Sequence, residues 1–314
     1  MKRSLSVIVP VYNEEENIKP LYKEIKNSAE LSIKRGLIED YEIVFVNDGS
    51  VDKTQENLED IKKKEIKLRI IELRKNFGQT AGLRAGFKIA KGDLIVTMDG
   101  DMQNDPADIP FLINKIDEGY DVVSGWRAER KDRFGKRVSS RVMNFLRRKL
   151  IGDELHDYGC SLKIYKKDCM KDLELFGELH RYITAYLYIK GYKIGEIKVN
   201  HRQRFRGKTK YGFSRGINGF LDLLYLKFWA SYSDRPLHFF GRFGIYQIIL
   251  AGIIVIEQVI KALVVKGLYL GPLLVFASML VITGILFIMF GFLSEINSRN
   301  YYKDKEYSSI KKTL

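Results

Sequence analysis

Two aspartates, Asp99 and Asp101, stand one residue apart directly after the apolar run Leu94–Met98. That run is rich in β-branched residues and predicts a buried strand that ends at the carboxylates. Two like charges this close repel each other by roughly 1–4 kcal/mol at ~4 Å. A hard divalent cation removes the repulsion, and Mg²⁺ is usually held by one or two carboxylates together with substrate phosphates. The pair therefore indicates a metal and diphosphate site, against the simpler alternative of a solvated turn.

Two further polar segments follow predicted strands. Pro10-Val11-Tyr12-Asn13-Glu14 follows a strand over 5–9, and Asn47-Asp48-Gly49-Ser50 follows a strand over 41–46. The carboxyl ends of parallel strands meet at one edge of a sheet, where open α/β sheets bind their ligands. We therefore expect all three segments to lie at that edge.

The elements that must position these segments alternate between strand and helix over residues 5–126. This alternation predicts an α/β fold with a mostly parallel sheet and right-handed crossovers. A basic helix over 137–151 follows. The remaining expected strands are 67–73, 121–124, 160–166 and 192–199. The remaining expected helices are one that ends at about Arg35, one that Asp52 can cap, and those over about 78–90, 106–118 and 179–190.

The C-terminal part predicts a transmembrane hairpin. The apolar segments 239–263 and 268–293 are each long enough to span a bilayer, and the link between them is short. Glu257 and Lys261, four residues apart, can pair or snorkel near the interface. Residues 211–229 form either a helix in the membrane interface or a helix packed on the preceding domain.

The net charge of +14 is concentrated in two stretches. Residues 127–149 hold ten Lys/Arg against two acids, and 198–215 hold seven and no acid. Basic stretches favour a cytoplasmic leaflet, so the large domain and both chain ends are expected on the cytoplasmic side of the cell membrane. The two cysteines form no framework, which favours a reducing compartment, and the four scattered histidines carry no zinc spacing.

The sequence argues against dinucleotide-binding enzymes, serine hydrolases with a nucleophile elbow and phosphate-loop enzymes. No Gly-x-Gly-x-x-Gly follows a strand, and no Gly-x-Ser-x-Gly occurs. Gly207-Lys208-Thr209 lacks the glycine that a phosphate loop needs five residues earlier, because that position is Arg202.

The combined motifs resemble glycosyltransferase family 2 over residues 1–215, and the hairpin narrows the resemblance to its polyprenyl-phosphate glycosyltransferases. The resemblance implies a GT-A type nucleotide-diphospho-sugar transferase domain over 1–210. An interfacial amphipathic segment over 211–236, the two spans within 237–296 and a basic cytoplasmic tail over 297–314 complete the expected domains.

The resemblance also implies roles for the residues of the donor site. Asp101 is the expected direct ligand of Mg²⁺ or Mn²⁺, and Asp99 supports it through the nucleotide or a water. Asn47 stands where the family often has Asp, so the resemblance leaves open which group bonds the base of the nucleotide. The residues implied to bind the nucleotide sugar are Pro10, Tyr12, Glu14, Asp48, Gln79, Asp99 and Gln103.

On the acceptor side, Arg127 is expected to assist catalysis by positioning the acceptor phosphate, and Asp157 to act as base or orienter, with a loop turn as the simpler alternative. Thr209 stands where the juxtamembrane segment of this group usually has Ser. The residues expected to bind the acceptor phosphate are Arg130, His180, Arg181, Arg202, Arg206 and Lys208.

The expected reaction is inverting transfer of a sugar, with UDP-glucose as the first choice of donor, to a polyprenyl phosphate. The expected partners are therefore a nucleotide sugar, polyprenyl phosphate and the bilayer, with no nucleic acid and with a possible homo-oligomer. Three alternatives stay open: a processive polysaccharide synthase, whose Gln-x-x-Arg-Trp is missing here, a membrane-anchored enzyme acting on a soluble or lipid-linked sugar acceptor, and a non-catalytic nucleotide-binding scaffold.

Overall fold

The chain forms two compact units, Met1–Leu224 and Tyr225–Leu314. The structure is a computed structural model. The residues whose structure is described are 3–128, 151–152, 155–171, 173, 175, 177–203, 215–233, 235–265 and 271–303.

The described part of the N-terminal unit contains a seven-stranded sheet in the order β3-β2-β1-β4-β6-β5-β7. Adjacent strands are parallel except around β6, which pairs antiparallel with both β4 and β5. The expectation of a mostly parallel sheet is confirmed. The strands are β1 (Ser4–Val11), β2 (Asp40–Asn47), β3 (Leu68–Glu72), β4 (Leu94–Thr97), β5 (Val122–Trp126), β6 (Lys163–Lys166) and β7 (Ile194–Lys198).

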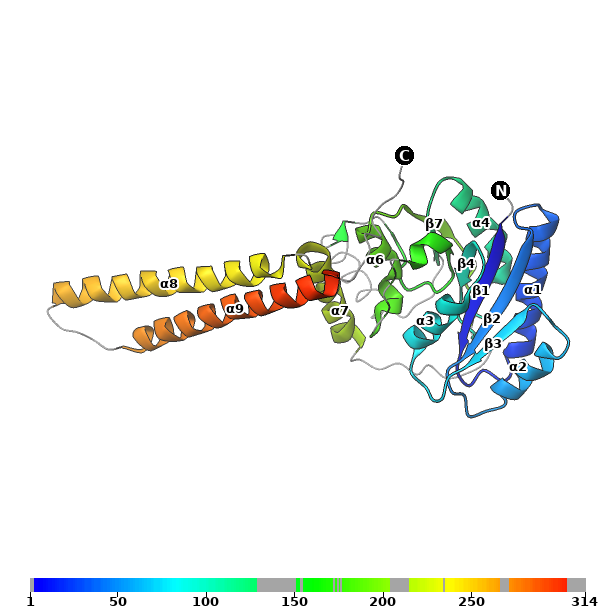
Figure 1. Ribbon diagram of the computed structural model, residues 1–314, viewed down its shortest axis with the longest axis horizontal. Coiled ribbons are helices and arrows are strands. Elements are labelled where there is room, and N and C mark those ends of the chain that lie inside the picture. Colours follow the sequence, from blue (N-terminus) through cyan, green and yellow to red (C-terminus); the bar gives the residue numbers. More distant parts are fainter. Residues whose placement is uncertain are drawn as a thin grey trace. The chain divides into compact units, whose positions relative to one another are not determined.

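Helices cover both faces of this sheet, with α1 and α4 on one side and α3 on the other (Figure 1). The central strands are buried on both faces, which explains their nearly continuous apolar sequences. The described helices of this unit are α1 (Ile18–Lys34), α2 (Thr54–Lys62), α3 (Gln79–Ile89), η1 (Pro106–Asp108), α4 (Ile109–Asp117), η2 (Lys167–Met170), η3 (Leu179–Tyr182) and α6 (Ile183–Ile189); α7 (Arg215–Tyr232) begins in this unit and ends in the next.

Glycines bring α3 close to the sheet. A Cβ on Gly86 would overlap the side chain of Ile8, and one on Gly82 would lie 3.2 Å from Pro10 Cβ. The two residues therefore serve close helix–strand packing. Gly78 caps α3 with a φ of 89°, a conformation that glycine adopts without strain.

The predicted elements of this unit agree with the structure to within a few residues at their ends. The exceptions concern the later segments. Most of the basic helix expected over 137–151 lies outside the described residues. The helix expected within 211–229 is observed as α7, and its assignment to the membrane interface stays a prediction.

The C-terminal unit contains two long helices, α8 (Pro236–Val265) and α9 (Pro272–Lys303). Both are long and apolar enough to cross a membrane, and their apolar side chains are largely exposed. They fit the predicted hairpin, although α9 begins at Pro272 rather than at residue 268 and continues into the expected tail. The Glu257–Lys261 ion pair on α8, at 2.6 Å, is also as expected.

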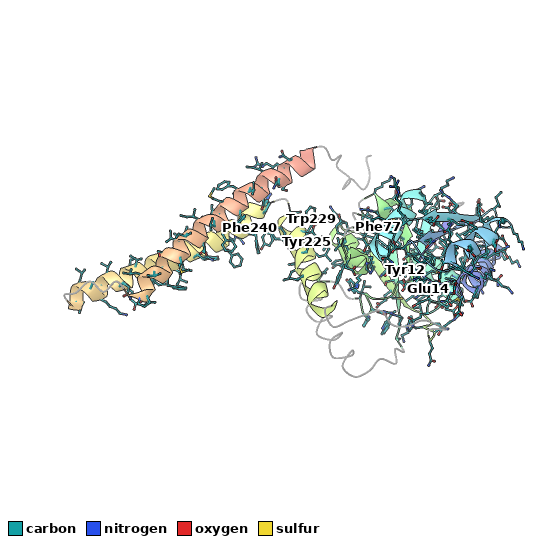
Figure 2. All side chains as sticks on the ribbon, turned by 90° about the horizontal axis from the view of Figure 1, so that it is seen from below. Tyr12, Glu14, Phe77, Tyr225, Trp229 and Phe240 are labelled. Atoms are coloured by element: carbon teal, nitrogen blue, oxygen red, sulfur yellow. The ribbon has the colours of Figure 1, made fainter. Side chains whose placement is uncertain are left out.

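Close packing and one hydrogen bond join α8 to α9. A Cβ on Gly284 would lie 2.8 Å from the carbonyl oxygen of Gly244, so the two backbones touch. Thr283 Oγ1 donates to Gln247 Oε1 at 2.8 Å. In this unit Tyr225 stacks on Trp229, two of the residues labelled in Figure 2. Small residues and interhelical hydrogen bonds are typical of helix pairs in membranes.

Candidate active site

The predicted strand ends meet at one edge of the sheet. β1 pairs in parallel register with both β2 and β4, so Val11 lies opposite Asn47 and Ile8 lies opposite Thr97. The segments that continue from these strands therefore emerge side by side. Figure 2 shows Tyr12 and Glu14 together at this edge.

The loops after β1 and β2 are joined by side-chain hydrogen bonds. Asn13, whose φ is 56°, donates its backbone N–H to Ser50 Oγ at 2.9 Å and accepts from the Val51 N–H at 2.9 Å. The Glu14 N–H donates to Thr54 Oγ1 at 2.9 Å, and its carboxylate accepts from Asn17 at 2.6 Å. These contacts fix the backbone that presents Tyr12.

Asp48 organises a third loop at the same edge. Its two carboxylate oxygens accept the backbone N–H groups of Phe77 and Gly78, both at 2.8 Å. The side chain is buried, and both of its oxygens accept hydrogen bonds from the backbone at the start of α3. The structure thus gives Asp48 a loop-holding role, and direct contact of Asp48 with a nucleoside stays a prediction.

Asp99 and Asp101 lie just beyond β4. Asp99 Oδ1 accepts from Gln79 Nε2 at 2.6 Å, and the Asp99 N–H donates to Asn104 Oδ1 at 3.1 Å. Asp101 is 9% exposed and accepts the Gln103 N–H at 3.2 Å. The Asp99–Gln103 segment is therefore a compact turn after β4, and the Gln79–Asp99 hydrogen bond ties this turn to the start of α3.

Two backbone features hold this turn. A Cβ on Gly100 would lie 2.6 Å from Val11 Cγ1, so a larger residue here would displace the side chain of Val11. Met102 has a φ of 63°, in the left-handed region that non-glycine residues rarely enter. Such strain persists only where the surroundings enforce it, and it is frequent at functional sites.

Burial and the charge of Asp101 raise the pKa of the Asp99 carboxyl, while a hydrogen bond from Ser161 and the charges of Arg127 and Lys163 oppose the rise. No set of three His, Cys, Asp or Glu side chains gathers in a metal-binding arrangement among the described residues. The two aspartates alone suit a hard cation whose other ligands are phosphate oxygens and water. This donor set fits Mg²⁺ or Mn²⁺ and does not fit an all-protein metal cage.

Arg127 and Asp157 form a bidentate ion pair. Arg127 Nε donates to Asp157 Oδ2 at 2.7 Å and Nη2 donates to Oδ1 at 2.9 Å. The backbone N–H groups of Arg127 and Gly159 donate to the same carboxylate at 3.2 and 3.1 Å. Burial would lower the pKa of Arg127, but the hydrogen bonds and charge of Asp157 raise it, so the guanidinium is charged. Four hydrogen bonds make Asp157 a poor base and favour the orienter role.

The described residues proposed for the acceptor phosphate have partners within the protein. His180 Nδ1 is 2.7 Å from Thr80 Oγ1, which joins η3 to the first turn of α3. Arg181 forms an ion pair with Glu178 at 2.7 Å. Both residues lie next to the helix that carries Gln79, and their phosphate-binding role stays a prediction.

Arg202 forms two ion pairs within the protein. Its guanidinium contacts Glu24 at 2.6 Å and Asp105 at 2.6 Å. It therefore links α1 to the segment after β4, and its role at the acceptor phosphate stays a prediction. The three remaining predicted acceptor residues lie outside the described residues; they are Arg130, Arg206 and Lys208.

Sequence reasoning missed several residues of the site. Lys163 on β6 is 4% exposed and lies within electrostatic reach of Asp99, Arg127 and Asp157. A lysine in a short strand pattern normally faces solvent, so no sequence pattern indicates this burial. His201 was missed as well; its Nε2 lies 3.4 Å from Gln103 Nε2.

This fold and this site define a sugar-nucleotide transferase of the GT-A type. The chain belongs to glycosyltransferase family 2, whose description (Glycosyl transferase family 2) matches residues 6–174. Membership in this family makes the protein an enzyme that transfers sugars.

Relatives of nearly the same length narrow the class. The chain is 39% identical to the dodecaprenyl-phosphate galacturonate synthase of Rhizobium johnstonii, over 96% of this chain and 89% of that protein. It is 32% identical to the undecaprenyl-phosphate 4-deoxy-4-formamido-L-arabinose transferase of Photorhabdus laumondii, over 95% and 90%. Both relatives are named as polyprenyl-phosphate sugar enzymes.

A solved structure confirms the fold. The glucosyl-3-phosphoglycerate synthase of Mycobacterium tuberculosis, crystallised with Mn²⁺ and UDP-glucose, superposes with a TM-score of 0.54. The match covers 72% of this chain and 79% of that chain at 18% identity. At this identity the likeness supports the architecture alone.

Proposed function

We propose that this protein transfers a sugar from a nucleoside diphosphate sugar to a polyprenyl phosphate, with inversion at the anomeric carbon. The observation that carries the proposal is the presence, in one chain, of the Asp99–Asp101 turn and of an apolar hairpin long enough to span a bilayer. The names of the relatives support the same acceptor class. A prenyl chain stays in the bilayer, so its phosphate is accessible only to a site held at the headgroup level.

Asp101 and Asp99 would hold Mg²⁺ or Mn²⁺ together with the diphosphate of the donor. The ion, when bound, neutralises the charge that develops on the leaving diphosphate. A protein of the same fold has been crystallised with Mn²⁺ and UDP-glucose, which supports a divalent ion and a nucleotide sugar as the molecules bound. Gln79 holds Asp99 in place, and the backbone of Gln103 holds Asp101.

The nucleophile is a phosphate oxygen, which is already anionic near neutral pH because its second pKa is about 6. A strong base is therefore unnecessary, and the four hydrogen bonds to Asp157 agree with a positioning role. Arg127 uses Nε and Nη2 on Asp157, while Nη1 has no partner among the described residues. We propose that Nη1 binds the acceptor phosphate, since guanidinium groups suit phosphate oxygens.

The resemblance and the relatives indicate different sugars. UDP-glucose is the donor expected from the resemblance of the sequence. The relative with 39% identity is named for galacturonate, and the one with 32% identity for a formamido-arabinose. The donors to be tested are therefore nucleotide-linked glucose, galacturonate and formamido-arabinose. The catalytic domain is proposed to lie on the cytoplasmic side, where basic stretches are favoured.

A direct assay tests the proposal. Membranes containing the protein are incubated with each radiolabelled donor and a polyprenyl phosphate, with and without Mg²⁺ or Mn²⁺. We expect one donor to yield a lipid-extractable product that mild acid cleaves, only when the metal is present. A product found solely as a water-soluble polymer would support a polysaccharide synthase and refute the proposal.

A further inference from the structure

Lys163 is a buried lysine at the centre of the site. It lies on β6 opposite Thr97 of β4 and Ser124 of β5, so it sits between the strand that leads to Asp99 and the strand that leads to Arg127. Only 4% of the residue is exposed. An ammonium group is costly to bury and is retained where it is hydrogen-bonded or paired.

The ammonium of Lys163 holds the turn that carries Asp157. Lys163 Nζ donates to the carbonyl oxygen of Cys160 at 2.6 Å and to that of Tyr158 at 3.2 Å. These two carbonyls flank Gly159, whose own N–H donates to Asp157 Oδ1 at 3.1 Å. One side chain therefore fixes the backbone on both sides of a hydrogen bond to the orienting carboxylate.

The same turn also packs against Arg127. A Cβ on Gly159 would lie 2.9 Å from Arg127 Nη2, so a small movement of this backbone would displace the guanidinium. Because Asp157 binds that guanidinium through both oxygens, carboxylate, turn and cation move as one unit. Lys163 is the member of this unit that anchors it to the sheet.

Charges of both signs surround Lys163. Burial and the charge of Arg127 lower the pKa of the Lys163 ammonium, and the carboxylates of Asp157 and Asp99 oppose this effect. The same three aspartates that the site needs for metal and orientation, Asp99, Asp101 and Asp157, face two cations, Arg127 and Lys163. A neutral residue at 163 would remove one of these two cations.

We propose that Lys163 is a positioning residue of the transfer reaction, which anchors the Tyr158–Cys160 backbone to β6 and thereby fixes the Asp157–Arg127 pair. The proposal rests on the proposed function for its kinetic consequence. Its structural consequence, a rigid turn at Gly159, is independent of the substrate.

The kinetic test compares Lys163→Met with Lys163→Arg in the full-length protein. The methionine has a similar length and no donor, so kcat falls about tenfold or more while KM for the donor changes less than about twofold. The arginine keeps a charged donor and restores most of kcat. Lys166→Met is the matched control, because Lys166 lies on the same strand but pairs with Asp121 at 2.9 Å.

A double-mutant cycle identifies the route of the effect. If Lys163 acts through Asp157, then Lys163→Met lowers kcat no further in an Asp157→Asn background, because groups that act as a unit are not additive. Additive losses would refute the proposal. So would a kcat for Lys163→Met within about twofold of the wild type.

Hydrogen exchange supplies a readout that needs no turnover. The amide of Gly159 should exchange faster in Lys163→Met than in the wild type or in Lys166→Met, with little change in the strands. Unchanged exchange at Gly159 would refute the inference even if no substrate were found, and an inactive wild type would refute only the proposed function. Should Lys163→Met fail to fold, Lys163→Gln, which can serve one carbonyl, takes its place in both experiments.

Discussion

The side-chain amide of Gln79 donates to Oδ1 of Asp99 across 2.6 Å and joins the first turn of α3 to the end of β4. Twenty residues separate the pair along the chain, and the amide approaches an aspartate whose pKa is already raised by burial and by Asp101. Gln79 thus fixes the carboxylate without adding charge.

Substitution of Gln79 should weaken the donor site in a graded order. Gln79→Leu loses a hydrogen bond to a charged group, about 1.5–3 kcal/mol, so kcat/KM for the donor falls by about one to two orders of magnitude. Gln79→Glu places a second carboxylate against Asp99 and should be worse. Donor-dependent initial rates at saturating metal measure the order, and a Gln79→Glu variant more active than Gln79→Leu would contradict this role.

The two aspartates should differ in their metal dependence. Asp101→Asn removes the proposed direct ligand, and transfer should fall by about a thousandfold, since a bound ion supplies several kcal/mol. Asp99→Asn still accepts from Gln79 and should lose about tenfold with a higher metal requirement. Metal titrations of both variants, with membrane fractionation as the control for folding, measure this difference. Equal losses would show that the two side chains share the metal equally.

Gly100 should be replaceable only together with Val11. In Gly100→Ala the new Cβ would lie 2.6 Å from Val11 Cγ1, and such overpacking costs about 1–3 kcal/mol. Activity and melting temperature should both fall, because the turn that presents Asp99 and Asp101 must shift. The double variant Gly100→Ala/Val11→Ala should recover part of both. A double variant worse than either single would place the cause in the backbone conformation instead.

The donor edge could be predicted from sequence because its parts are local. Each polar segment directly follows a periodic apolar strand, and the parallel arrangement brings such ends together whatever the details of packing. Asp99 and Asp101 were placed at this edge in this way, directly after the strand over 94–98.

The acceptor side could not be predicted in the same way, because its contacts are between residues far apart in the chain. Arg202 binds Glu24 and Asp105, and no periodicity in the sequence announces either pairing. Lys163 was missed because β6, which pairs antiparallel with both β4 and β5, lies inside the sheet, where its residues 163–165 are buried. A strand at the sheet edge would have left the same lysine in solvent.

Arg202 should contribute to stability with a defined pH dependence. Burial opposes ionisation of Asp105, but hydrogen bonds from Asn200, Ala107 and Arg202 lower its pKa below the ordinary 3.8. A lowered pKa stabilises the fold above about pH 4, and the contribution is lost as the pH falls through the folded-state value.

Arg202→Met should therefore lower the stability of the catalytic unit by about 1–3 kcal/mol at pH 7, with a smaller deficit at pH 3. Thermal melts of the solubilised protein at both pH values measure the difference. The kinetic constants for the acceptor should stay near those of the wild type. A rise of about tenfold or more in KM for polyprenyl phosphate would instead show that Arg202 binds the acceptor phosphate.

The membrane hairpin should depend on the contact between Gly244 and Gly284. A side chain at Gly244 would meet the backbone of Gly284 and the side chain of Ile288, whereas no atom lies within 4 Å of a Cβ at Gly252 on the same helix. Close approach of backbones through small residues is a main source of helix association in membranes. Gly244→Leu should therefore separate α8 from α9, and Gly252→Leu should not. Cysteines introduced as Gln247→Cys and Thr283→Cys measure the separation by cross-linking, because the native side chains are hydrogen-bonded at 2.8 Å.

Cross-linking that survives Gly244→Leu as well as Gly252→Leu would contradict the prediction. It would show that the remaining contacts hold the two helices together without the glycine pair.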